Sequence, residues 1–174
     1  QLTKKMFQAN ISGENLNGSG GYLRTGDLGF IKYNELYICG RAKDMVIVRG
    51  LNYFPQDIEK IAEDSSNHIR KGCVVAFDIL EEEEKLVVVV GLKNAKTFPD
   101  PIKIAAAIRK ILNIQPHTIT FVLARTVPKT SSGTIRRLLT KQNWQVGKLD
   151  VLEQHTGIKE AEALRDLLLG KKVG

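Results

Sequence analysis

Apolar residues recur along this chain with two different spacings, and each spacing predicts one kind of element. Helical spacing occurs in residues 55–63 and again in residues 101–112. Both segments start with a proline, which suits the first turn of a helix because the N–H group that it lacks would have no partner there. Short apolar runs rich in β-branched residues predict strands instead. These runs cover residues 28–32, 35–39, 44–48, 74–79, 86–92 and 118–123.

The strands at 74–79 and 86–92 are expected to pair as a β-hairpin, with the acidic run 81–84 at its tip. Four like charges repel one another, so this run is predicted to face water. A further helix is expected to begin near Gly133, and residues 161–169 fit an amphipathic helix. Strands and helices thus alternate, which predicts an α+β fold with a three-stranded sheet, a β-hairpin and packed helices.

Composition sets the outer limits of this picture. The chain has 174 residues, 43% of them hydrophobic and 26% charged, which is enough for one packed domain with flanking pieces. No apolar run approaches the roughly 18 residues needed to span a membrane. The chain opens without a signal segment, and Cys39 and Cys73 form no motif, so we expect the reducing cytoplasm. Because the first residue is Gln1, we also expect a fragment of a longer protein.

The formal net charge of +7 raises the question of nucleic acid binding. Lysine and arginine are spread along the chain, however, and no aromatic platform is interleaved with them as single-strand binding would require. We therefore expect no nucleic acid partner, and a basic surface that attracts polyanions such as ATP, coenzyme A or an acidic carrier protein. No metal site is predicted either, because His68, His117 and His155 lie far apart and neither cysteine stands at ligand spacing from them.

Three motifs carry the candidate chemistry. They are GYLRTGDLG at 21–29, GRAKDMVIVRGLNYFPQDIE at 40–59, and VPKTSSGTIRR at 127–137. In this order they resemble the acyl-adenylate-forming superfamily, which includes acyl-CoA synthetases, adenylation domains of peptide synthetases and luciferases. The ending NYFPQDIE is most similar to the fatty acyl-AMP ligase branch, and the resemblance covers residues 20–145.

The resemblance implies that residues 1–40 are the last β-rich remnant of a large N-terminal adenylating domain. Residues 41–146 are then the small C-terminal lid domain, and residues 147–174 a linker or helix. The implied parent enzyme uses ATP, with Mg bound outside this chain, to convert a fatty acid to acyl-AMP. The lid rotates between this step and transfer of the acyl group, a hinged gating motion.

Acyl carrier protein is the favoured acceptor in this interpretation, as in polyketide synthesis. Two alternatives stay open: the lid of an acyl-CoA synthetase that uses coenzyme A, and a non-catalytic homologue that docks a carrier protein. The fragment alone is expected to be inactive.

The resemblance also assigns roles to single residues. Asp27 matches the aspartate that accepts hydrogen bonds from both ribose hydroxyls of the nucleotide, a task that suits a carboxylate. Arg41 matches the arginine that also reaches the ribose, and Lys43 stands at the hinge position. Gly50 lies in the turn that faces the acceptor channel, where the absence of a side chain leaves room for the thiol arm.

Thr134 departs from the family pattern, which places a lysine directly after the motif glycine. That lysine neutralises charge at the substrate carboxylate and the α-phosphate, and loss of such a contact costs on the order of 10²–10³ in rate. Three interpretations stay open: a changed residue in an active enzyme, a lid kept for the transfer step, or an inactive homologue. Lys129 cannot be assumed to substitute, and the geometry of Arg136 and Arg137 is open.

Overall fold

The computed structural model describes residue 7 and residues 21–168. The chain divides into two compact units, Gln1–Lys43 and Asp44–Gly174, and each is described by itself. In chain order the elements are β1 (Asp27–Lys32), β2 (Glu35–Arg41), the 3₁₀ turn η1 (Ala42–Asp44), β3 (Val46–Val48), β4 (Leu51–Tyr53), α2 (Pro55–Asp64), β5 (Ile69–Leu80), β6 (Glu84–Leu92), α3 (Pro101–Leu112), β7 (Thr118–Leu123), the 3₁₀ turn η2 (Ala124–Thr126), α4 (Arg137–Gln145), β8 (Val151–Thr156) and α5 (Ile158–Leu168).

The first unit is an antiparallel hairpin of β1 and β2. Its two-residue turn is formed by Tyr33 (φ 52°) and Asn34 (φ 65°). Two positive φ angles in succession are the mark of a type I′ turn, whose twist matches that of the flanking strands. The two strands predicted here are confirmed, and β2 continues two residues further, to Arg41.

The second unit is a four-stranded sheet in the order β5-β6-β7-β8, covered by helices on both faces. Strands β6 and β7 run parallel, and the other two pairs are antiparallel. Helices α2 and α3 cover one face, where Val74, Ala76, Val88 and Val90 join the larger apolar cluster. Helix α4 covers the other face, against which the alternate residues of the same strands pack. Burial on both faces explains the unbroken apolar runs CVVAF within β5 and LVVVV within β6.

The α+β class is confirmed, but the sheet has one strand more than the three predicted. The additional strand is β8, in the stretch 147–174 that was assigned to a linker or helix. It pairs antiparallel with β7, and Thr120 Oγ1 donates to Gln154 Oε1 at 3.2 Å across that pair. The sequence VLEQHT alone gives little strand signal. Its conformation follows from the open edge of β7, whose backbone groups need a partner.

The helix expected near Gly133 also starts later than predicted, at Arg137. Lys129 and Ile135 instead form an antiparallel bridge, which holds the preceding residues extended. The other helices agree with their patterns: α3 coincides with residues 101–112, and α2 exceeds its predicted range by one residue. Helix α5 begins at Ile158 rather than 161, and residue 169 of its predicted range lies outside the described residues.

Candidate functional site

The two predicted ribose ligands lie side by side on neighbouring strands. Asp27 opens β1 and Arg41 closes β2, and the register of the hairpin pairs them directly. Arg41 Nε donates to Asp27 Oδ1 at 3.1 Å, and the side chains are 56% and 30% exposed. This bond uses one carboxylate oxygen and one guanidinium nitrogen. The second carboxylate oxygen can accept hydrogen bonds from the hydroxyls of a diol, and the terminal amino groups can donate hydrogen bonds to them.

Lys43 lies in η1, is exposed, and is the last residue of the first unit. Immediately before it, the backbone N–H of Ala42 donates to Gly26 O at 2.9 Å. The backbone of the first unit is therefore tied down up to Ala42. The division between the units thus coincides with the position predicted as the hinge, while the hinge motion itself stays a prediction.

Gly50 occupies a two-residue turn between β3 and β4, with Arg49 at φ 52° and Gly50 at φ 71°. Within the second unit, a Cβ added at Gly50 would meet no atom within 4 Å. The local need for glycine is therefore its positive φ rather than space. The backbone N–H of Gly50 donates to Glu84 Oε2 at 2.9 Å, which fastens this turn to the β5–β6 hairpin.

The acidic run 81–84 is exposed at its first three residues, as predicted, but not at Glu84. Besides the bond from Glu84 to the turn, Lys85 Nζ donates to Glu81 Oε2 at 2.6 Å. This hydrogen bond lowers the pKa of Glu81 and raises the pKa of Lys85 from their ordinary values. The hairpin tip is thus a connected polar corner.

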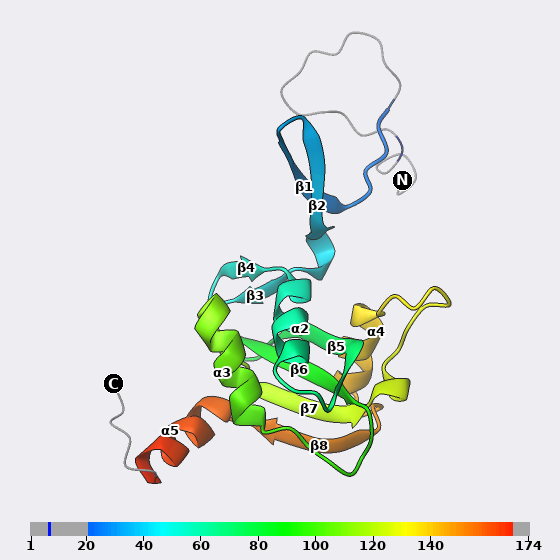
Figure 1. Cartoon of the computed structure of the whole chain (residues 1–174). Coiled ribbons are helices and arrows are strands. Elements are labelled where there is room, and N and C mark those ends of the chain that lie inside the picture. The colour runs from blue at the N-terminus through cyan, green and yellow to red at the C-terminus, as the bar shows by residue number, and fades with distance from the viewer. Residues whose placement is uncertain (1–6, 8–20, 169–174) are drawn as a thin grey trace. The chain divides into compact units, whose positions relative to one another are not determined.

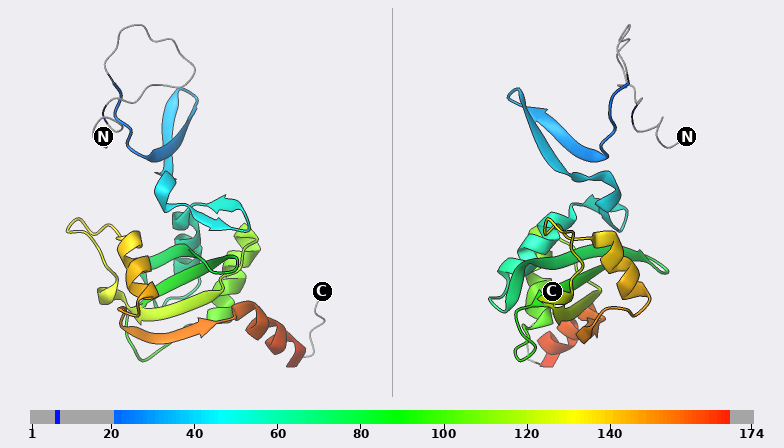
Figure 2. Two further views of the ribbon diagram at one scale, coloured as in Figure 1. Left: turned by 180° about the vertical axis from the view of Figure 1, so that it is seen from behind. Right: turned by 90° about the vertical axis from the view of Figure 1, so that its right-hand side faces the viewer.

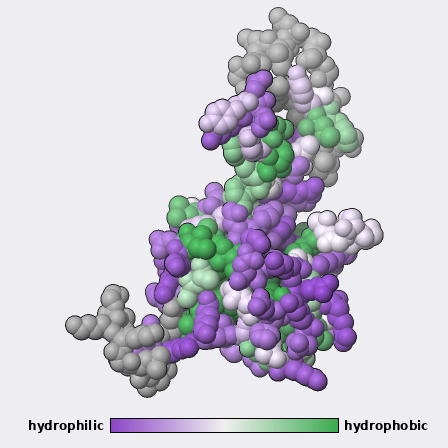
Figure 3. All heavy atoms as spheres, viewed as in Figure 1, coloured by the Kyte–Doolittle hydropathy of each residue, from purple (hydrophilic) through white to green (hydrophobic). Residues whose placement is uncertain are grey.

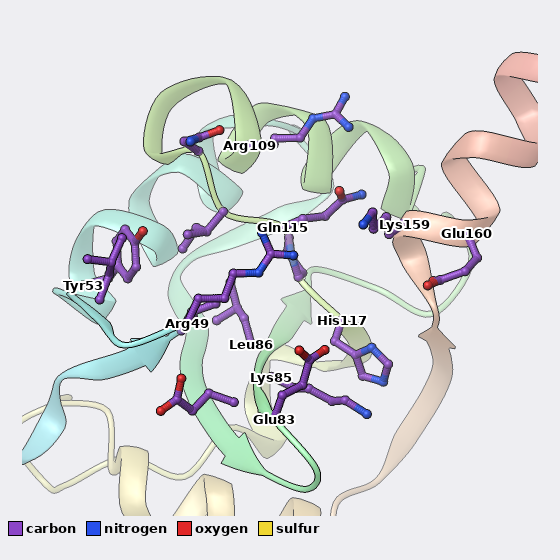
Figure 4. Close-up of a pocket in the computed structure, with 16 residues that line it drawn as sticks. Arg49, Tyr53, Glu83, Lys85, Leu86, Arg109, Gln115, His117, Lys159 and Glu160 are labelled. Carbon is purple, nitrogen blue, oxygen red and sulfur yellow. The ribbon is translucent and has the colours of Figure 1, made fainter. Parts of the chain in front are cut away.

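A hollow of about 490 Å³ lies beside this corner, and Figure 4 shows the side chains that line it. Arg49 reaches into it from the β3–β4 turn, and Lys159 borders it from α5. Its basic residues are Arg49, Lys85, Arg109, His117 and Lys159, and its acidic residues are Glu83, Glu84 and Glu160. The hollow can take a polar or anionic group. Sequence reasoning missed it because its residues are scattered along the chain and no spacing connects them.

Thr134 lies on a loop that extends from the body of the second unit (Figures 1 and 2) and appears as a pale, weakly polar lobe in Figure 3. The loop is a small hairpin: Thr130 N donates to Thr134 O at 2.8 Å, and Gly133 turns the chain at φ 85°. The N–H of Thr134 donates to Thr130 Oγ1 at 3.0 Å. Thr134 is exposed, so its side chain is available to a ligand but brings no charge.

Lys129, the nearest upstream cation, contacts the sheet. Its Nζ donates to Cys73 Sγ on β5 at 3.3 Å, in a partly buried contact. The ammonium group is therefore turned toward the sheet.

Arg137 is held in a buried ion-pair cluster. Its Nε and one terminal nitrogen each donate to a carboxylate oxygen of Glu59 at 2.8 Å, and the other terminal nitrogen lies 3.4 Å from Asp44. Glu59 is 6% exposed and also accepts from Ala76 N at 3.1 Å. Burial opposes the charge on Arg137, but the bonds and charges of Glu59 and Asp44 outweigh it and raise the pKa of Arg137.

This cluster was not found from the sequence. The one available signal was a glutamate on the apolar face of that helix, next to Ile58 and Ala62. A carboxylate in such a place needs a charged partner. The partner stands 78 residues away along the chain, so only the fold identifies it.

Neither a metal-binding cluster nor a membrane-spanning helix is found among the described residues. In the described part of the chain, no three His, Cys, Asp or Glu residues gather closely enough to hold a metal ion. Among the helices of residues 21–168, none has the length and apolar character to cross a membrane.

Comparison with known proteins identifies the relatives of this chain. It is 38% identical over 157 residues to the medium-chain-fatty-acid--[acyl-carrier-protein] ligase JamA of Moorena producens, covering 87% of this chain and 26% of that protein. It is 33% identical over 153 residues to the long-chain-fatty-acid--AMP ligase FadD32 of Mycobacterium marinum, covering 74% of this chain and 24% of that one. A solved fatty acyl-adenylate ligase, from work on the E. coli and L. pneumophila enzymes, matches with a TM-score of 0.60 at 33% identity, over 73% of this chain and 23% of its own.

The chain thus spans about a quarter of the length of these relatives. The relatives confirm the resemblance to acyl-adenylate-forming enzymes that the three motifs indicated. Residues 43–154, more than half of the chain, match the family described as Disco-interacting protein 2-like, AMP domain. The chain belongs to this Disco-interacting protein 2-like AMP-domain family.

Proposed function

We propose that this chain is the C-terminal lid, with the end of the large domain, of an ATP-dependent ligase that converts a fatty acid to acyl-AMP. The observation that carries the proposal is the pair of Asp27 and Arg41, two predicted ribose ligands 14 residues apart that meet at 3.1 Å. The names of the relatives, which are fatty-acid ligases, support the same substrate class.

In the proposed reaction, a carboxylate oxygen of the fatty acid forms a bond to the α-phosphorus of ATP while the bond to pyrophosphate breaks. Asp27 Oδ2 accepts from the ribose hydroxyls, and the terminal amino groups of Arg41 donate to them. ATP supplies the activated phosphorus, and Mg is expected to be bound by the rest of the parent enzyme. Thr134 lies on the loop that faces the reacting groups.

The proposed domain division is residues 1–40 for the end of the large domain and 41–146 for the lid. Because β8 belongs to the same sheet, we extend the proposed lid to include Val151–Thr156. Lys43 is then the hinge residue, and the turn at Gly50 faces the acceptor channel after the lid rotates.

Acyl carrier protein is our proposed acceptor, in line with the name of the relative JamA. Coenzyme A is the alternative, and a non-catalytic docking role is the second alternative because Thr134 lacks charge. Location in the cytoplasm stays a prediction.

The test is an ATP–pyrophosphate exchange assay on the full-length parent with a panel of fatty acids. The unmodified parent is compared with its Thr134→Lys and Asp27→Ala variants. We expect exchange by at least one of the first two, and a loss in the Asp27→Ala variant through weaker ATP binding. Absence of exchange from both the parent and Thr134→Lys refutes the ligase proposal. Adding a carrier protein or coenzyme A then identifies the acceptor.

A further inference from the structure

We propose that Arg136 is a catalytic residue that supplies the positive charge missing at Thr134. This inference rests on the proposed ligase function and concerns its first half-reaction. It assigns a specific replacement for the lysine that the motif lacks.

The side chains along the loop alternate in direction. Ile135 is partly buried and packs against the smaller apolar cluster, as Trp144 and Leu149 also do. Because successive side chains of an extended segment alternate in direction, Thr134 and Arg136 project to the opposite, outer side. Both are exposed, as this alternation requires.

The other two cations of the motif are bonded to residues of the second unit. Lys129 is bonded to Cys73 on the sheet, and Arg137 is held by Glu59 and Asp44. Within residues 21–168, the guanidinium of Arg136 has no ion pair or side-chain hydrogen bond. Arg136 is therefore the cation of this motif that remains available to a ligand.

The backbone of Arg136 is held by hydrogen bonds, while its side chain is exposed. Arg136 N donates to Pro128 O at 3.0 Å, and Arg136 O accepts from Thr140 N at 2.9 Å and from Thr140 Oγ1 at 3.1 Å. The backbone of Arg136 is thus fixed at the base of the loop, and its long side chain can extend toward the tip of the loop. A guanidinium also offers a planar fork of donors that matches phosphate oxygens.

In the proposed step, the guanidinium donates hydrogen bonds to an α-phosphate oxygen and to the attacking carboxylate. Negative charge builds up on the phosphate oxygens as the new P–O bond forms and pyrophosphate leaves. Arg136 transfers no proton and stays charged throughout, so its contribution is electrostatic.

The test uses the full-length parent in the exchange assay. We expect Arg136→Gln to lower kcat for exchange by about 10²–10³ and Arg136→Lys to lower it less. The double variant Arg136→Gln/Thr134→Lys should recover most of the activity, because the charge returns at the family position. The matched control is Arg125→Gln, an exposed arginine on η2 outside the loop, which should equal the parent.

A binding measurement provides a readout that does not depend on turnover. Titration calorimetry with a non-hydrolysable fatty acyl sulfamate analogue of acyl-AMP should show that Arg136→Gln binds it at least about tenfold more weakly than the parent does. Melting temperatures of the variants should match the parent, because within residues 21–168 the exposed side chain of Arg136 makes no hydrogen bond or ion pair.

The outcomes separate this inference from the function on which it rests. An active parent whose Arg136→Gln variant exchanges and binds equally well overturns the role of Arg136 and leaves the ligase proposal intact. A parent that is inactive until Thr134 is replaced with lysine also overturns the role of Arg136 and leaves the ligase proposal intact. Inactivity of both the parent and Thr134→Lys refutes the ligase proposal, and the role of Arg136 with it.

Discussion

Replacing Arg137 with methionine tests the buried cluster that joins helix α4 to the rest of the second unit. The change removes two hydrogen bonds of 2.8 Å to Glu59 and leaves that carboxylate, 6% exposed, with a single bond from Ala76 N. Breaking a buried ion pair by removing one partner costs about 3–5 kcal/mol. Arg137 keeps 16% of its side-chain surface exposed, so we expect the low end of that range, about 3 kcal/mol.

A loss of this size should appear clearly in thermal unfolding of the 174-residue chain. For a domain of this size it corresponds to a fall of roughly 10 °C in the melting temperature. Lys60→Met is the matched control, since it removes an exposed ion pair with Asp64 on the surface of α2, where such pairs contribute less than about 1 kcal/mol.

A double variant separates the ion pair from simple loss of packing. Replacing Glu59 as well, in Arg137→Met/Glu59→Leu, removes the stranded carboxylate and should recover most of the lost stability. If Arg137→Met melts within 2–3 °C of the parent chain, or no lower than the Lys60→Met control, the buried cluster does not stabilise the fold as argued.

Three further changes have definite expected results. Gly50→Ala should destabilise the chain by about 1–2 kcal/mol in urea unfolding, because alanine is strained at φ 71° although its Cβ has room; no loss at all would contradict the turn geometry. Asp100 is partly desolvated, but its bonds from Arg165 and the α3 N-terminus hold its pKa below the ordinary value. A carboxyl group with a lowered pKa stabilises the fold at pH values above its pKa in the unfolded chain, and this stabilisation is lost as the pH falls below about 4. Asp100→Asn should therefore reduce the dependence of the unfolding free energy on pH in this range. Asp27→Asn in the parent should weaken ATP binding in calorimetry, and unchanged affinity would remove Asp27 from the ribose site.

Helices and strands were predictable where the local sequence signals agree with one another. Helix α3 agrees with its predicted range because an apolar stripe, Pro101 at its start and the cap from Asp100 all favour the same limits. The loop around Gly133 was misjudged because its helical residues follow a bridge between Lys129 and Ile135, which local propensity does not report.

The candidate site shows the same division between local and distant information. The pairing of Asp27 with Arg41 could be expected, because the strands that carry them are neighbours in a hairpin. The hollow at Arg49 could not be expected, since α3 and α5 contribute to it from distant parts of the chain.

By itself, the sequence determined the three motifs, the alternation of strands and helices, and the absence of a lysine at Thr134. Only the tertiary structure decided what the neighbouring cations do. The partner of a long side chain depends on which groups the fold brings close to it. Lys129 therefore bonds to Cys73 and Arg137 to Glu59, while Arg136 stays exposed. The fourth strand, β8, has the same origin, because the open edge of β7 and not the pattern of residues 151–156 makes it a strand.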